Sequence, residues 1–250
     1  MVYLDCQNLD TALASFAAAC NRSVDAVAEA IRSHPADWDE YEPQLEEAGL
    51  PQMLDHLGLA GTDVTFDGAF YFHGTRVFDP GTFAREGILP LGQIIDRIWA
   101  SLHVLVADTV SDRQWRGLRA DLEAGLGRGG IQYRNKTPNP RLHGPYAHLA
   151  RQHHLPHDGH HDYLAIPEIV EDIARTCELV LAQRFQAATT PCVVKFHADH
   201  MNSEILQAGF WYVHGMLHHG SPGELARCHY NGNGNAVPAL DVVSVEIIEN

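Results

Sequence analysis

Nothing in this 250-residue sequence points to a membrane or to an oxidising compartment. No hydrophobic run approaches the roughly 20 apolar residues that a transmembrane helix needs. The first residues include Asp5 and Asp10 and lack the basic region of a signal peptide. The five cysteines are scattered and form no CxxC pair, so neither a disulfide framework nor a thiolate zinc site is indicated. We therefore expect a cytoplasmic protein without membrane contact.

Positive charge is also scarce, since the formal net charge is −15. Binding to nucleic acid or to anionic lipid needs clustered Lys and Arg, so the charge argues against both partners. It leaves room for a small anionic ligand, which needs only one or two cations or a helix N-terminus. The stretch from Asp37 to Glu47 carries six carboxylates and no Lys or Arg, which is typical of a solvated face or linker.

Motifs of nucleophilic catalysis are missing as well. The sequence contains no GxSxG, and no cysteine has an obvious local partner. The glycine-rich segment Asn231–Asn235 lacks the lysine and the following helix of a phosphate-binding loop. We interpret it as a flexible turn.

Hydrophobic spacing predicts a helical pair near the N-terminus, over residues 9–20 and 24–31, and a short helix over 51–57. A helix-turn-helix DNA-binding module is one interpretation of the pair. A packing hairpin is the simpler one, because the second helix offers few cations. We therefore expect a helical N-terminal unit over residues 1–60.

The following residues, 64–250, combine helical and strand patterns without a regular βαβ rhythm, so we expect a mixed α+β domain. Residues 127–145 are rich in Gly, Pro, Asn and Arg and are expected to form a loop. The predicted helices cover 91–102 and 115–126 and a long helix that begins at Pro167, and the predicted strands cover 70–73, 192–196, 210–213 and 242–248.

One of these strands ends in residues that suit a ligand. The aromatic run Phe70–Phe72 leads into His73, Gly74, Thr75 and Arg76, and a Gly-Ile-Leu segment follows at Gly87. A strand end commonly holds ligands. A neutral imidazole can donate a hydrogen bond to a ribose hydroxyl, and a glycine lets a planar amide approach the backbone.

This pattern resembles the start of the ADP-ribosyltransferase fold, in particular its poly(ADP-ribose) polymerase-like branch. The resemblance covers about twenty residues here, and the later segment Gly144-Pro145-Tyr146-Ala147 is similar to the family's Gly-x-Tyr-Phe-Ala strand. It implies a mixed β-sheet core with flanking helices. It also implies NAD as substrate, with ADP-ribose transferred to an unknown macromolecule or small molecule and nicotinamide released.

The resemblance also implies roles for single residues. His73 and Thr75 would anchor the ribose of NAD and Gly74 the carboxamide. Either Arg76 or an arginine of residues 128–141 would meet the pyrophosphate. Either Tyr146 or Tyr163 would stack on nicotinamide.

Asp241 stands where the family has a glutamate that supports the charge on the departing ribose. Its side chain is one methylene shorter, and a displacement of about 1 Å can cost about 100-fold in rate. The domain is therefore either a diverged transferase or a nucleotide-binding protein without this activity.

A second candidate site is the histidine-rich segment 153–162. Imidazole is a common ligand of zinc and other divalent metals, and an open metal site would support a hydrolase. The five candidate ligands are His153, His154, His157, His160 and His161. Pro156 and Gly159 indicate a loop, and a solvated loop is the alternative. A third possibility is a non-catalytic interaction protein that binds through its acidic N-terminal region.

Overall fold

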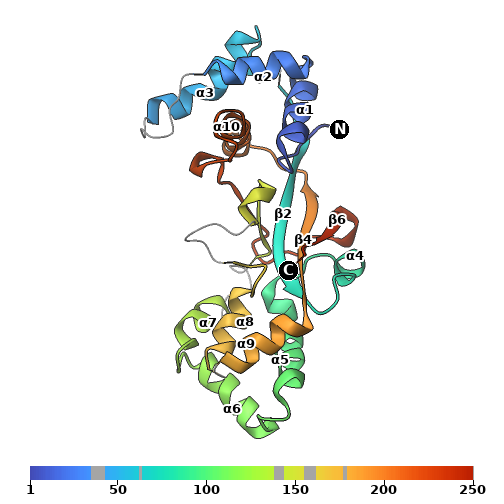
Figure 1. Ribbon diagram of the computed structural model, residues 1–250, viewed down its shortest axis with the longest axis vertical. Coiled ribbons are helices and arrows are strands. Elements are labelled where there is room, and N and C mark those ends of the chain that lie inside the picture. Colours follow the sequence, from blue (N-terminus) through green and yellow to red (C-terminus); the bar gives the residue numbers. More distant parts are fainter. Residues whose placement is uncertain (35–42, 62–63, 138–143, 155–161, 177–178, 250) are drawn as a thin grey trace. The chain divides into compact units, whose positions relative to one another are not determined.

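The computed structural model describes residues 1–34, 43–61, 64–137, 144–154, 162–176 and 179–249. It confirms a mixed α+β protein (Figure 1). The helices are α1 (Leu9–Cys20), α2 (Val24–Arg32), α3 (Pro43–His56), α4 (Thr82–Glu86), α5 (Leu91–Val106), α6 (Asp112–Glu123), α7 (Gly130–Lys136), α8 (Glu168–Ala174), α9 (Leu179–Ala188) and α10 (Ser203–His219). None of the helices in the described part of the chain is long and apolar enough to span a bilayer.

The strands are β1 (Tyr3–Leu4), β2 (Gly68–Val77), β3 (Tyr146–His148), β4 (Thr190–Ala198), β5 (His229–Asn231) and β6 (Val242–Ile247). They form one sheet in the order β5-β3-β2-β4-β6, with β1 paired to β2. The β1–β2 pair is parallel, and the β2–β3 pair is antiparallel with Phe72 opposite His148. The sequence patterns for β2, β4 and β6 are therefore confirmed.

The chain divides into two compact units, each made of three segments. Unit 1 comprises residues 1–72, 148–155 and 196–230, and unit 2 comprises residues 73–147, 156–195 and 231–250. This division differs from a boundary at residues 60–64, because α10 packs against α1, α2 and α3 and so joins the N-terminal helices. Strands β2 and β4 each contribute residues to both units.

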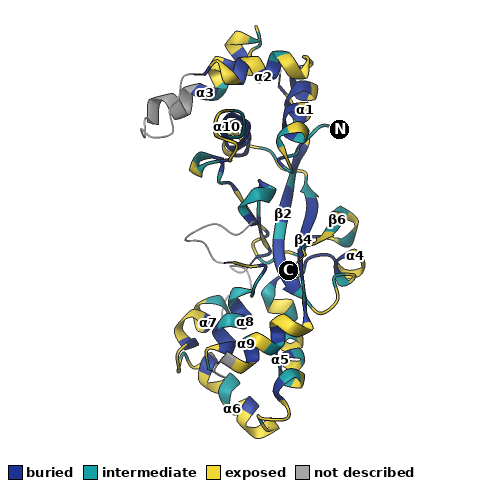
Figure 2. Cartoon of the chain, in the orientation of Figure 1, coloured by how far each residue is buried: buried dark blue, intermediate teal, exposed yellow. Residues whose placement is uncertain are grey.

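Unit 1 is built on the predicted helical pair. Asn8 caps α1 through a capping box, because its side chain accepts from the Thr11 amide while the Thr11 hydroxyl oxygen accepts from the Asn8 amide. Ser23 caps α2 with its side chain, which accepts from the Ala26 amide. Along α2, Val27 and Ile31 are fully buried. Figure 2 shows buried faces on α1, α2 and α10 with exposed residues on the opposite sides. The pair is thus a packing element.

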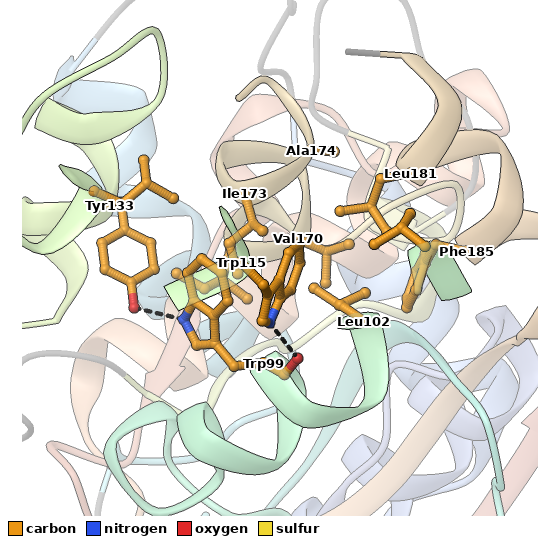
Figure 3. Close-up of a cluster of buried hydrophobic side chains, with 12 residues drawn as sticks. Trp99, Leu102, Trp115, Tyr133, Val170, Ile173, Ala174, Leu181 and Phe185 are labelled. Atoms are coloured by element: carbon orange, nitrogen blue, oxygen red, sulfur yellow. Dashed lines mark hydrogen bonds between the residues drawn. The ribbon is translucent and has the colours of Figure 1, made fainter. Parts of the chain in front are cut away.

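Unit 2 has a separate core in its helical part (Figure 3). The indole N–H of Trp99 donates to the Tyr133 hydroxyl at 2.8 Å, and that of Trp115 donates to the Trp99 carbonyl at 3.2 Å. The polar ends of these large rings are therefore satisfied inside the core. Buried residues come from α5 to α9: Trp99, Leu102, Val106, Trp115, Leu122, Tyr133, Ile169, Val170, Ile173, Ala174, Leu181 and Phe185.

Three local predictions are wrong. Residues 210–213 belong to α10 and not to a strand, because Asn202 caps a 17-residue helix whose burial accommodates the bulky Phe, Trp and Tyr side chains. Residues 130–136 of the expected loop form α7, which buries Tyr133. The helix after Pro167 has seven residues, so α10 is the longest described helix.

Candidate functional site

His73 lies inside β2 and not at its end, because the strand continues to Val77, and it contacts the second motif of the resemblance. Within unit 2, His73 Nδ1 is 2.7 Å from the Tyr146 carbonyl oxygen. A carbonyl can only accept, so Nδ1 carries the proton and Nε2 of the neutral ring is an acceptor. Burial lowers the pKa of His73, while the bond to Tyr146 partly opposes the shift. The ring is therefore neutral at physiological pH, and Nε2 accepts where the sequence argument assigned it a donor role.

The glycine-rich turn packs against the same motif. Gly232 donates its N–H to the Pro145 carbonyl, and Gly234 donates to the Gly144 carbonyl, both at 3.0 Å. A Cβ at Gly232 would lie 2.7 Å from Pro145 Cδ, so only glycine fits this approach. The Tyr146 side chain is 48% exposed. The two residues before Tyr146 are therefore hydrogen-bonded to the glycine-rich turn, and Tyr146 itself is half-exposed.

The Gly-Ile-Leu segment pairs with the residues that precede Asp241. Ile88 and Val237 exchange two backbone hydrogen bonds of 2.9 Å. Gly87 has φ +75°, and a Cβ there would lie 2.0 Å from the Val237 carbonyl oxygen. Asp241 ends a 3₁₀ turn immediately before β6, and its amide donates to the Pro238 carbonyl at 3.0 Å. The segment from the glycine-rich turn to Asp241 thus links the Gly-Ile-Leu segment to the Gly-Pro-Tyr-Ala segment through backbone hydrogen bonds inside unit 2.

The other residues of the His-Gly-Thr-Arg element are buried. Gly74 and Thr75 lie inside β2, and Thr75 is 8% exposed. Arg76 is 7% exposed and donates to the Thr189 hydroxyl and to the Leu164 and Gln186 carbonyls at 2.8–3.0 Å. A buried guanidinium needs this complete set of acceptors. This geometry assigns Arg76 a structural role in place of the predicted pyrophosphate contact.

Tyr163 has a different environment from Tyr146. Its hydroxyl donates to Glu168 at 3.0 Å, and Glu168 is 3.1 Å from the Lys136 ammonium. Burial, and then the neighbouring Glu168 charge, raise the pKa of Tyr163 to about 12. Lys136 also binds the buried Asp172 at 2.7 Å. Lys136 therefore joins α7 to α8 and Tyr163 adds a bond to this network through Glu168, whereas the Tyr146 carbonyl is bound by His73.

The histidine-rich segment is described only at its start. His153 and His154 form part of a 3₁₀ turn, and His154 Nε2 is 2.6 Å from the Phe72 carbonyl. His157, His160 and His161 lie outside the described residues. Among residues that the structure describes, no group of three His, Cys, Asp or Glu is arranged to hold a metal ion.

The structure groups two further histidines with this turn. His148 has ring-centre distances of 5.5 Å to His153, 4.8 Å to His154 and 4.6 Å to His229. Burial, and then the neighbouring imidazoles, lower the pKa of His148 to about 2. His148 and His229 were missed because they are isolated in sequence, and only strand pairing brings distant residues into one cluster.

Comparison with protein-family models, with curated proteins and with solved structures gives no match for this chain. Its function is therefore inferred from its residues and their geometry.

Proposed function

We propose that unit 2 binds NAD and transfers its ADP-ribose group to an acceptor, with release of nicotinamide. The observation that carries this proposal is the 2.7 Å bond between His73 and the Tyr146 carbonyl. These residues belong to two motifs 73 positions apart that the resemblance assigns to one site. The bond fixes the tautomer of a neutral imidazole and joins it to the backbone of a residue that is 48% exposed.

The residues fit the nicotinamide riboside half of NAD. Nε2 of His73 can accept a hydrogen bond from a ribose hydroxyl. The ring of Tyr146, which is 48% exposed, can stack on nicotinamide. Gly74 places no side chain between the backbone and a carboxamide. Tyr146 is preferred to Tyr163 as the stacking residue, because its carbonyl accepts from His73, whereas the hydroxyl of Tyr163 donates to Glu168.

In the proposed reaction the bond between ribose C1′ and the nicotinamide nitrogen breaks. Nicotinamide keeps the bonding electron pair, and the acceptor forms a new bond to C1′ and loses its proton. His73 holds the ribose, and the stacked ring orients the leaving group. Asp241 would stabilise the positive charge that develops on the ribose. Because aspartate is shorter than the glutamate that the resemblance implies, slow transfer is expected.

Calorimetric titration with NAD tests the binding part of the proposal. We expect His73→Ala and Tyr146→Ala each to weaken binding by about fivefold, because each loses a hydrogen bond or a ring contact that contributes on the order of 1 kcal/mol. Tyr163→Ala is the matched control and should change binding less than about twofold. Absence of NAD binding to the folded wild type, or a larger loss in Tyr163→Ala than in Tyr146→Ala, would overturn the assignment.

Release of nicotinamide tests the chemical step. Asp241→Asn should abolish release, because the amide cannot stabilise positive charge. Asp241→Glu should increase release, since it restores the side-chain length that the resemblance implies. If both variants release nicotinamide at the wild-type rate, Asp241 has no role in the reaction.

A further inference from the structure

The negative charge of the chain is concentrated in one unit. Unit 1 contains 16 Asp and Glu and four Lys and Arg, so its formal charge is −12. Unit 2 contains 16 Asp and Glu and 13 Lys and Arg, so its formal charge is −3. A net charge of −15 for the whole chain therefore says little about the surface of unit 2.

Most described cations in the helical part of unit 2 are paired with carboxylates. Arg97 binds Glu86 at 2.7 Å, and Arg119 binds Asp96 at 2.6 Å. Lys136 binds Asp172 at 2.7 Å. Arg175 and Arg184 pair similarly with Glu171 and Asp108. These ion pairs neutralise cations of α5, α6, α7 and α9, and of Arg175 after α8, within the unit.

Four arginines differ from this pattern. Arg113, Arg116, Arg128 and Arg134 are exposed, and within the described ranges of the chain no carboxylate lies within ion-pair distance of them. They lie on α6, on α7 and in the connection between these two packed helices. We call them the arginine surface. Figure 2 shows exposed residues along α6.

Two residues on the α6 part of the arginine surface do not stabilise the helix that carries them. Arg113 lies in the first turn of α6, where the helix dipole disfavours a cation by a few tenths of a kcal/mol. Gly117 lies on the same exposed side of α6, with nothing within 4 Å of a Cβ built there. Glycine inside a helix costs about 1 kcal/mol relative to alanine. Neither residue is explained by the stability of α6.

The chemistry of the arginine surface favours phosphate and nucleobases. Arginine binds phosphate with two parallel hydrogen bonds and stacks on planar rings. Leu126 and Ile131 lie in the same segment and are 57% and 59% exposed, which offers apolar contact to unstacked bases. A membrane-bound helix would need an apolar face, but Trp115 and Leu122 of α6 are buried in the core.

We propose that the arginine surface of unit 2 binds single-stranded nucleic acid through its phosphates. This inference goes beyond the proposed NAD site and does not depend on it. It revises the expectation that the chain does not bind nucleic acid. That expectation came from the net charge of the whole chain, which combines an acidic unit with a nearly neutral one.

Fluorescence anisotropy of a labelled 12-nucleotide single strand, measured with the full chain and without NAD, tests the proposal. Four phosphate contacts predict that log K falls with log salt with a slope of about −2.8. Affinity should therefore drop about 50-fold between 50 and 200 mM salt. Arg113→Gln/Arg116→Gln should halve this slope, so that the drop becomes about sevenfold.

Arg85→Gln/Arg175→Gln is the matched control, because it removes two exposed cations that are ion-paired in the same unit. It should leave both affinity and slope unchanged. The proposal is overturned if the wild type does not bind at 50 mM salt, or if both double variants lose affinity equally. It is also overturned if anionic vesicles or a polyglutamate peptide bind more tightly than the oligonucleotide. Because NAD is absent, none of these outcomes bears on the NAD site.

Discussion

Protonation of one buried histidine should destabilise unit 1 in acid. His214 lies on α10, is 0% exposed, and has ring-centre distances of 5.6 Å to His34 and 4.3 Å to His218. Burial, and then the neighbouring His218, lower the pKa of His214 to about 4. The folded state therefore binds fewer protons than the unfolded state below the ordinary histidine pKa of about 6.5. Stability is present above that pH and is lost as the pH falls towards 4.

The size of the effect follows from the two pKa values. With about 6.5 in the unfolded state and about 4 in the folded state, the free energy of unfolding falls by about 2 kcal/mol between pH 7 and pH 5. By pH 4 the loss reaches about 3 kcal/mol. The total cannot exceed about 3.4 kcal/mol, which corresponds to a shift of about 2.5 pKa units.

Urea unfolding at several pH values isolates this contribution. We compare the wild type with His214→Gln, which keeps a donor for the His34 carbonyl but does not titrate. Between pH 7 and pH 5, the free energy of unfolding of the variant should fall by about 2 kcal/mol less than that of the wild type. His219→Gln, an exposed position on the same helix, is the control and should follow the wild type. Parallel curves for wild type and His214→Gln, within 0.5 kcal/mol, would refute the reasoning.

Two further perturbations test the fold of unit 2. Arg76→Met should lower the free energy of unfolding by about 3 kcal/mol, because it leaves buried acceptors unpaired, while Arg85→Met at an exposed ion pair should change it by less than about 0.5 kcal/mol. A thermal melt in which both variants match would contradict the structural role of Arg76. Gly87→Ala should cost about 2 kcal/mol or more, since it combines a positive φ with a clash, whereas Gly117→Ala should raise stability by about 1 kcal/mol. Equal melting shifts for the two alanine variants would show that Gly87 is not constrained.

The helices that sequence predicts well are those with local signals. Asn8 and Ser23 mark the beginnings of α1 and α2, and apolar spacing marks their buried faces. The Phe-Trp-Tyr-Val run at 210–213 misleads because its β propensity is overridden by the cap at Asn202 and by burial on several sides of α10. Likewise, the glycines at 127–130 predict a break but cannot reveal that Tyr133 enters a core and forms α7 around it.

In the candidate site as well, the sequence does not reveal contacts between residues that are far apart in the chain. Resemblance placed His73 and Tyr146 in one site, but the direction of their hydrogen bond depends on the folded backbone. The sequence could not distinguish a pyrophosphate contact of Arg76 from buried contacts within the fold, because its acceptors are 88 to 113 residues away. His148 and His229 belong to different strands, so no local spacing connects them.

The composition of unit 1 from three separated segments has a consequence for synthesis. The apolar faces of α1 and α2 are translated first, but α10, which packs against both, begins only at residue 203. At about 5–20 residues per second, these faces wait on the order of 10–30 s for their partner. During that time the nascent chain presents unsatisfied hydrophobic surface next to the ribosome. Unit 1 is therefore completed only once α10 has been synthesised, although α1 and α2 are made before every segment of unit 2.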